Sequence, residues 1–229
     1  MLRLSMTVRN EEQRYLKKVL ESARLYIDDA VIIDDASTDN TVLLCESVLR
    51  EIPHRIIRNE ESKFHNEWEL RRQQWDETVK NNPDWILFLD ADEMFENSFA
   101  YGVKTLTQTP DCYLFSFRLY DFWDDDHYRD DDLWRAHHYY RPFMLRYKSD
   151  FAYEFAQTSQ HCGRMPYNVF QLPNLISEFR VKHFGWAKRE DRIIKFNRYM
   201  LLDPNGENGS MAQYLSINDE NPNLIKWEE

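Results

Sequence analysis

Glycine is scarce in this sequence, with only five residues among 229. A phosphate-binding loop of the GxGxxG or GxxxxGK(S/T) type needs glycines at fixed spacing, because its backbone must approach the phosphates closely. No glycine here falls in either spacing. Nucleotide binding through a glycine-rich loop is therefore disfavoured. The five residues are Gly102, Gly163, Gly185, Gly206 and Gly209.

Positive charge is also in short supply. Lys and Arg number 29 against 40 Asp and Glu, which gives a formal net charge of −11. Because no stretch concentrates Lys or Arg, the sequence disfavours nucleic acid or an anionic membrane surface as the main partner. A ligand that carries phosphates would need local positive charge to counteract the net negative charge of the chain, and a divalent cation supplies it.

Cysteine and long apolar runs are lacking as well. The chain has three cysteines and no CxxC pair, so neither a disulfide scaffold nor a structural zinc site is indicated. The N-terminus MLRLSMTVRN lacks a signal-peptide pattern, and no apolar run is long enough to span a membrane. We therefore expect a cytoplasmic chain without a transmembrane segment. Nothing in the sequence predicts an oligomeric state.

The sequence does contain a repeated strand and helix pattern. Strands are predicted at 2–8, 30–34, 55–58 and 85–89, and apolar residues recur at helical spacing between them. One such helix is predicted to open at Asn10, and another lies within 66–81. Repeated units of this kind, with nearly continuous apolar strands, predict an α/β fold with a mostly parallel central sheet flanked by helices.

The pattern is less regular beyond residue 100. Strands are predicted at 113–123 and 141–147, separated by an aromatic and acidic stretch. Since no linker or internal repeat marks a boundary, we expect a single domain over 1–229 whose second half adds to the first.

Two acidic clusters follow predicted strands. Asp34 and Asp35 follow AVII, and Asp90, Asp92 and Glu93 follow WILFL. Carboxyl ends of parallel strands meet at one edge of a sheet, so the clusters are expected to lie together. Asp90 and Asp92 can both face one hard cation. The alternatives are an Asx-turn with a helix cap for the first cluster and a solvated strand end for the second.

Three motifs in this order resemble the family-2 glycosyltransferases of GT-A fold. They are LSMTVRNEE at 4–12, VIIDDASTDNT at 31–41 and DWILFLDADE at 84–93. In that family a first strand ends in a polar stretch with NEE, a V-D-D-x-S-x-D-x-T turn follows, and a later strand ends in DxD. The resemblance covers about the first hundred residues.

The resemblance implies a nucleotide-sugar donor across the carboxyl edge of the sheet. Asp35 would hydrogen-bond the base, which suits a uracil N–H or the same edge of dTDP. Asp90 and Asp92 would hold the ribose and a Mn²⁺ or Mg²⁺ that bridges the diphosphate, and this ion would stabilise the charge of the leaving group. Glu93 could support the metal ligands or brace the loop. The donor-site residues implied are Thr7, Arg9, Glu11, Asp34, Asp35, Asp90 and Ala91.

Arg71 and Arg72 precede the DxD strand on a predicted helix, where related enzymes carry an arginine that braces the diphosphate or the acidic pair. The resemblance does not choose between the two. An exposed helix cation is the structural alternative for either one.

In the second half, residues 181–199 resemble an H-x-G-(Y/W) motif followed by a basic helix, which occurs in a subset of these transferases. His183 could bind the metal or the diphosphate, or be a core histidine. Lys188, Arg192 and Lys195 share one helical face and could lie over the phosphates. A solvated charged face is the alternative for this stripe.

An inverting transfer needs a base that takes the proton of the acceptor hydroxyl. Acidic candidates are abundant at 124–126 and 130–132, and Glu154 and His161 lie further on. We favour the second triplet, because nearby aromatic residues could stack on sugar rings, although an acidic surface loop is the alternative. The catalytic candidates are Asp131, Asp132 and His161.

The sequence therefore predicts a metal-dependent, inverting glycosyltransferase that moves a sugar to a glycan, lipid-linked or surface-polymer acceptor. Residues 1–100 would bind the donor and residues 101–229 would face the acceptor. A haloacid-dehalogenase-like phosphohydrolase also ends a strand in DxD, but it needs Thr or Val where Met94 stands. A catalytically inactive sugar-nucleotide or glycan-binding module is the other alternative.

Overall fold

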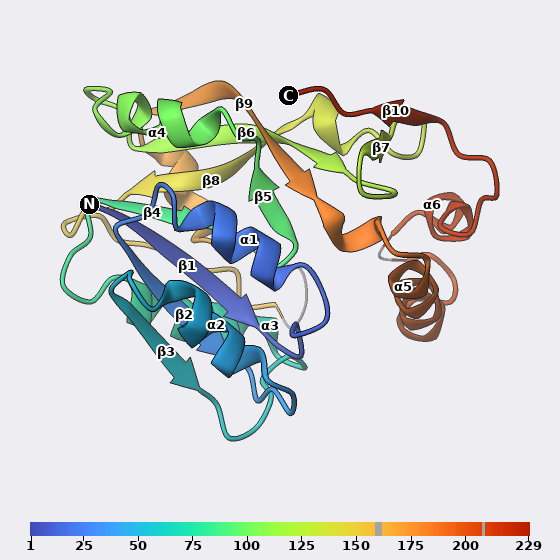
Figure 1. Ribbon diagram of the computed structural model, residues 1–229, viewed down its shortest axis with the longest axis horizontal. Coiled ribbons are helices and arrows are strands. Elements are labelled where there is room, and N and C mark those ends of the chain that lie inside the picture. Colours follow the sequence, from blue (N-terminus) through green and yellow to red (C-terminus); the bar gives the residue numbers. More distant parts are fainter. Residues whose placement is uncertain (159–161, 208) are drawn as a thin grey trace.

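The computed structural model describes residues 1–158, 162–207 and 209–229. Its central feature is an eight-stranded sheet in the order β3-β2-β1-β4-β8-β6-β9-β5 (Figure 1). The strands are β1 (Leu2–Val8), β2 (Asp29–Asp34), β3 (His54–Arg58), β4 (Trp85–Phe88), β5 (Glu93–Phe95), β6 (Leu114–Asp121), β8 (Tyr140–Arg146) and β9 (Asn174–His183).

The first half of the chain forms the parallel part of this sheet. β1 pairs in parallel with β2 and β4, and β2 pairs in parallel with β3. The prediction of an α/β fold with a mostly parallel sheet is confirmed, as are the four strands predicted in this half. The helices between them are α1 (Leu16–Ala23), α2 (Thr41–Leu49) and α3 (Glu67–Thr78).

The side chains of β2 point alternately to the two faces of the sheet and are buried on both. Ile32 joins the main core cluster with the apolar faces of α1 and α2, whereas Val31 and Ile33 pack with Leu70 of α3. A strand covered on both faces must be apolar throughout, which is why AVII reads as a continuous run. β4 follows the same rule, with Leu87 in the main core and Phe88 in a second cluster that contains Trp75 of α3.

The helix expected to open at Asn10 begins only at Leu16. Asn10 has a φ of 54°, and the backbone N–H groups that follow bond to the turn after β2. The N–H of Asn10 donates to Ser37 Oγ at 3.0 Å, and the N–H of Glu11 donates to Thr41 Oγ1 at 2.7 Å. The two sequence motifs therefore interlock, and these contacts replace the first helical turn.

The second half completes the sheet with antiparallel and parallel pairs. β8 runs antiparallel to β4 and β6, β9 runs parallel to β6, and β5 pairs antiparallel with β9. The predicted strands at 113–123 and 141–147 correspond to β6 and β8. The helix α4 (Phe99–Thr107) packs beside them through Phe99 and Val103.

A smaller unit lies beside the carboxyl end of β9, at the right of Figure 1. It contains a two-stranded sheet of β7 (His127–Arg129) and β10 (Leu224–Lys226), and the helices α5 (Arg189–Leu202) and α6 (Met211–Ser216). Its core contains Trp123, Trp134, Trp186 and Ile217. Among the described residues, no helix has the length and apolar character needed to cross a membrane.

Candidate active site

The loop after β4 presents the DxD carboxylates. Glu93, only 2% exposed, accepts a hydrogen bond from the backbone N–H of Asp90 at 2.8 Å. Its two carboxylate oxygens accept from the Arg164 guanidinium at 2.5 and 2.7 Å. Glu93 therefore braces the turn that carries Asp90 and Asp92, one of the two roles considered from the sequence.

Two arginines converge on Asp90. Arg71 Nη2 lies 3.2 Å from Oδ1 of Asp90, and Arg164 Nη2 lies 3.6 Å from Oδ2. Burial raises the pKa of Asp90, but the two guanidinium groups outweigh it and lower that pKa. Arg71 also donates to Thr7 Oγ1 at 3.3 Å, whereas the exposed Arg72 pairs with Asp76 one helical turn away. Of the two candidate arginines, the structure therefore brings Arg71 to the acidic pair.

Asp92 lies beside a histidine that a second carboxylate holds in place. His183 Nε2 is 3.6 Å from Asp92 Oδ2, and His183 Nδ1 is 2.6 Å from Asp121 Oδ1. Burial lowers the pKa of His183, but Asp92 and Asp121 outweigh it and raise that pKa to about 10. Asp121 ends β6 just as Asp34 ends β2. The loop after β4 and the end of β6 therefore deliver carboxylates to the two nitrogens of one imidazole, which ends β9.

Gly185 leaves the space in which these groups meet. A Cβ at Gly185 would lie 2.5 Å from His183 Nε2 and 2.7 Å from Asp92 Oδ2, and it would also collide with Lys195 Nζ. A side chain at this position would fill the space between three charged groups. The glycine of the H-x-G motif is thus required by close approach rather than by backbone conformation.

The basic face predicted on α5 divides into separate contacts. Lys195 Nζ reaches the Gly185 space and lies 4.4 Å from the ring centroid of Trp186. Arg192 instead donates to the carbonyl oxygens of Trp123 and Trp186 at 2.7 and 2.6 Å. Lys188 donates to the carbonyl of Gln13 at 3.0 Å. Of the three cations, Lys195 is therefore the one that reaches the carboxylate site.

Glu11 lies on the other side of the same group of charges. It pairs with Arg14 at 3.3 Å, and Arg14 pairs with Asp191 of α5 at 3.0 Å. Burial raises the pKa of Glu11 to about 7, and the nearby Asp92 adds to this effect. These contacts connect the NEE motif to α5 across the site.

Asp34 and Asp35 lie at the end of β2 with different partners. Asp34 is fully buried, accepts from the backbone N–H of Ser37, and lies 3.4 Å from Arg58. The carboxylate of Asp35 accepts from three groups of the loop after β3. Burial raises the pKa of Asp35, but these hydrogen bonds together outweigh it and lower that pKa. The donors are Asn59 Nδ2 at 3.0 Å, Ser62 Oγ at 2.7 Å and the Lys63 N–H at 2.9 Å.

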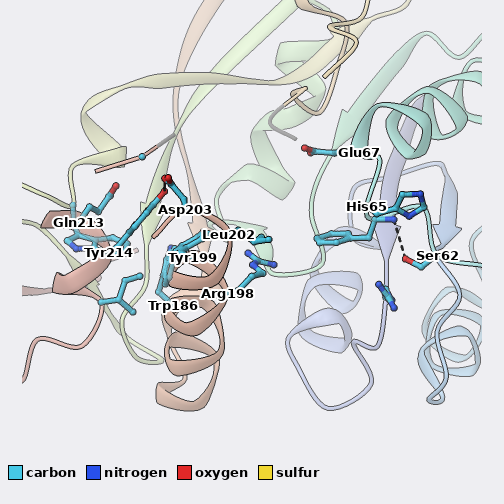
Figure 2. Close-up of a pocket in the computed structure, with 15 residues that line it drawn as sticks. Ser62, His65, Glu67, Trp186, Arg198, Tyr199, Leu202, Asp203, Gln213 and Tyr214 are labelled. Carbon is cyan, nitrogen blue, oxygen red and sulfur yellow. Dashed lines mark hydrogen bonds between the residues drawn. The ribbon is translucent and has the colours of Figure 1, made fainter. Parts of the chain in front are cut away.

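A cavity of about 900 Å³ adjoins this edge of the sheet. Figure 2 shows Ser62 and His65 on one side and Tyr199, Tyr214 and Trp186 on the other. The rings of Tyr199 and Tyr214 stack with centroids 5.0 Å apart. The remaining lining residues are Arg9, Phe64, Glu67, Trp134, Arg198, Leu202, Asp203, Gly209, Gln213 and Ile217.

The acidic triplet favoured for the base lies in the segment after β7. Asp131 Oδ2 accepts from Arg129 at 2.6 Å, and its Oδ1 accepts from the backbone N–H of Leu133. Asp132 is exposed, and Ala91 is buried between the DxD carboxylates. His161 lies outside the described residues.

Sequence reasoning did not select Arg164 or Asp121. Arg164 lies in an irregular segment, 71 residues from its partner Glu93, and no local pattern marks it. Asp121 did carry a signal, because it directly follows the apolar strand YLFSFRLY, as Asp90 follows WILFL.

Two relatives match most of the chain. Uncharacterized proteins from Mycobacterium tuberculosis (strain ATCC 25618 / H37Rv) and Mycobacterium bovis (strain ATCC BAA-935 / AF2122/97) are each 27% identical over 222 residues. The alignment covers 88% of this chain and 50% of each relative. The chain thus spans about half the length of the curated relatives it matches.

Solved glycosyltransferase structures share the fold. S. aureus TarS 1-349 gives a TM-score of 0.58 at 11% identity, covering 94% of this chain and 68% of that one. Its complex with UDP-GlcNAc gives 0.57 at 12% identity, covering 94% and 70%. GalNAc-T7 with UDP, GalNAc and Mn²⁺ gives 0.54 at 14% identity, covering 86% and 48%.

The family assignment rests on the sequence match together with this fold. The model of glycosyl transferase family 2 matches residues 4–165, which include all three motifs, most of β1 and the strands β2 to β8. The solved structures agree with a GT-A fold. The chain therefore belongs to glycosyl transferase family 2.

Proposed function

We propose that this chain transfers a sugar from a nucleotide-diphosphate donor, with a divalent cation, to a carbohydrate-containing acceptor. The observation that carries the proposal is the meeting of Asp92, His183 and Lys195 around Gly185 at the carboxyl edge of the sheet. Anionic and cationic groups converge on one point there. Such a mixture of charges suits a cation together with the phosphates that it neutralises.

The residues present fit a Mn²⁺ or Mg²⁺ ion. Asp90 and Asp92 offer carboxylate oxygens, and His183 offers Nε2, because its Nδ1 is bonded to Asp121. Histidine ligands of metals are usually held in this way by an outer carboxylate. When bound, the ion would stabilise negative charge on the diphosphate leaving group. GalNAc-T7, a structural neighbour, was crystallised with Mn²⁺ and UDP.

The chain's own cations would complete the phosphate site. Arg71 and Arg164 already face Asp90, and Lys195 faces Asp92. Burial lowers the pKa of Lys195, and Asp92 counteracts this effect. These charges locally oppose the net charge of −11. We propose that they bind and orient the diphosphate.

The base and ribose of the donor would lie toward the ends of β1 and β2. We propose contacts from Thr7, Arg9, Asp34 and Asp35, with the 1–100 half forming the donor site. Arg9 and Ser62 line the cavity, and Ser62 also bonds Asp35, which supports this direction for the nucleotide. UDP and dTDP both offer the N–H edge that Asp35 would bind.

The acceptor would enter from the 101–229 half. Trp186, Tyr199 and Tyr214 form an aromatic side of the cavity, and aromatic faces suit the apolar faces of sugar rings. We propose that a glycan, lipid-linked or surface-polymer acceptor binds against this aromatic side. We keep Asp131 and Asp132 as proposals for the base of an inverting transfer, each tested by replacement with Asn.

The test is a thermal-shift screen of UDP-, GDP- and dTDP-sugars with and without Mn²⁺, followed by measurement of nucleotide release. Binding stabilises a protein by mass action, so a cognate donor at 100 times its Kd raises stability by about 2.7 kcal/mol. Asp92→Asn should lose the metal-dependent shift and the turnover. Asp76→Asn, which changes an exposed helix carboxylate, is the matched control.

Two outcomes would contradict the proposal. Binding of a donor without turnover, with any sugar acceptor, favours the inactive binding module. The absence of a thermal shift with every nucleotide-sugar in the presence of Mn²⁺ would show that the chain has no donor site. The phosphohydrolase alternative is set aside, because three strands precede the DxD strand and the chain belongs to glycosyl transferase family 2.

A further inference from the structure

Two histidines and an aspartate meet on the segment that follows β7. Asp130 Oδ1 lies 3.3 Å from His137 Nε2 and 3.8 Å from His138 Nε2. One ligand atom from each of the three residues lies within 4.8 Å of the others. The histidines are neighbours on the short helix η1 (Ala136–His138).

These distances match the coordination shell of a transition metal. Zn²⁺ binds imidazole nitrogen and carboxylate oxygen at about 2.0–2.2 Å in a tetrahedron, which places the ligand atoms about 3.3–3.5 Å apart. Asp130 and His137 already have this spacing. His138 Nε2 would need to approach Asp130 Oδ1 by only a few tenths of an ångström.

Two of the three ligands are held in place. His137 is 7% exposed, and its ring stacks on Tyr120 at 5.0 Å and meets the edge of Tyr128 at 5.1 Å. The backbone of Asp130 is fixed from both sides, because its N–H donates to Asn223 O and its carbonyl accepts from Asn223 Nδ2. His138, 53% exposed, is the adjustable member.

The bonding of His137 is incomplete without a further partner. Within the described residues its buried Nδ1 has no hydrogen-bond partner. Its 3.3 Å contact with Asp130 is longer than the usual charge-assisted bond of about 2.7–2.9 Å. His183, in contrast, is bound by Asp121 at 2.6 Å. An ion bound at Nε2 would replace this long contact with a metal–nitrogen bond.

A second acidic group of similar dimensions has an ordinary explanation. Asp124, Asp126 and His127 also lie within 4.8 Å of one another. His127 Nδ1 already contacts Asp124 at 3.1 Å and Asp126 at 2.9 Å, and the group contains only one histidine. It therefore serves as the control rather than as a proposed site.

We propose that Asp130, His137 and His138 bind a transition-metal ion of the zinc class, with a fourth position open to solvent. This site is separate from the DxD site and does not depend on the proposed transfer reaction. Its ligands flank the segment that carries Trp134 into the cavity, where Trp134 Nε1 donates to Ser216 Oγ at 2.8 Å. A bound ion would fix this part of the cavity wall from both ends.

The experiment is calorimetric titration of untagged, metal-free protein with Zn²⁺, supported by the visible absorption of the Co²⁺ form. Wild type should bind one Zn²⁺ at this site and give the intense absorption of tetrahedral Co²⁺. His138→Ala and Asp130→Asn should each weaken this binding at least tenfold. His137→Ala is avoided, because the buried ring packs against Tyr120 and Tyr128 and its removal would disturb the fold.

The controls separate this site from the other carboxylate clusters. His127→Ala should leave the Zn²⁺ affinity unchanged, and Asp92→Asn should leave the Co²⁺ spectrum unchanged. Thermal unfolding of the metal-free variants shows whether each retains its fold. The proposal is overturned if folded His138→Ala and Asp130→Asn bind Zn²⁺ as wild type does, or if the spectrum is lost in Asp92→Asn instead.

Discussion

The imidazole of His183 stands between two carboxylates from different strands, with Nδ1 2.6 Å from Asp121 Oδ1 and Nε2 3.6 Å from Asp92 Oδ2. Asp121 ends β6, and Asp92 follows β4. Because Asp121 engages Nδ1, the other nitrogen is directed at the DxD loop. The arrangement fixes the ring and makes Nε2 the reactive atom.

Replacing Asp121 should weaken the proposed metal site without removing a ligand. Asp121→Asn keeps the size of the side chain but removes the charge that holds His183, and changes of this kind lower metal affinity or activity about 10–100-fold. The measurement is the Mn²⁺ concentration for half-maximal turnover, with Asp76→Asn as control. An unchanged Mn²⁺ requirement would show that Asp121 does not position the site.

A methyl group at Gly185 should abolish activity while the protein stays folded. The Cβ of Gly185→Ala would enter the space shared by His183, Asp92 and Lys195. We expect a loss of turnover of at least about 100-fold, since displacement of a reacting group by about 1 Å can have that effect. Turnover is compared with far-ultraviolet circular dichroism.

Gly206→Ala is the matched control for this substitution. Gly206 has a φ of 69° and is not one of the groups around Gly185, so alanine there introduces backbone strain without adding an atom between His183, Asp92 and Lys195. It should lower stability by about 1 kcal/mol and retain turnover per folded molecule. Equal turnover in both alanine variants would refute the role given to Gly185.

The Glu93–Arg164 pair should be important for stability. Removal of one partner from a buried ion pair leaves an uncompensated charge and lowers stability by about 3–5 kcal/mol. We expect Glu93→Ala to fall in this range in urea unfolding. Glu178→Ala removes an exposed carboxylate, 77% accessible and paired with Arg118, and should change stability by less than about 1 kcal/mol. Similar midpoints for the two variants would contradict this difference.

Glu11 should make stability fall as the pH rises. Burial raises its pKa from 4.5 to about 7, so the folded state favours the protonated carboxyl. The stability that Glu11 contributes is full below pH 4.5 and is lost as the pH rises through about 7. The upper limit is about 3 kcal/mol, from 1.36 kcal/mol per pKa unit.

Glu11→Gln isolates this contribution. The amide does not ionise, so the difference in unfolding free energy between variant and wild type should increase in favour of the variant between pH 4.5 and 7. Unfolding by urea at several pH values measures this difference. The contributions of the other carboxyl groups are the same in both proteins and cancel. A difference that stays constant with pH would show that Glu11 ionises normally in the folded protein.

The parallel half of the fold could be predicted from the sequence because its signals are local. The continuous apolar runs of β2 and β4 require cover on both faces, and the helical spacing at 66–81 corresponds to α3. β9 was not predicted, since its first residues are largely exposed at Asn174–Ile176 and show no strand period. The start of α1 was missed because side chains of another motif bind the N–H groups of Asn10 and Glu11.

By itself, the sequence determined the type of fold and the presence of carboxylates at the edge of its sheet, through periodicity and the residues that follow each strand. Tertiary structure alone decided which charges meet there. It selected Arg71 over Arg72, brought Arg164 to Glu93, and set Asp121 behind His183. These partners lie tens of residues apart, and electrostatic and hydrogen-bond contacts depend on distance in space, which local sequence patterns do not encode.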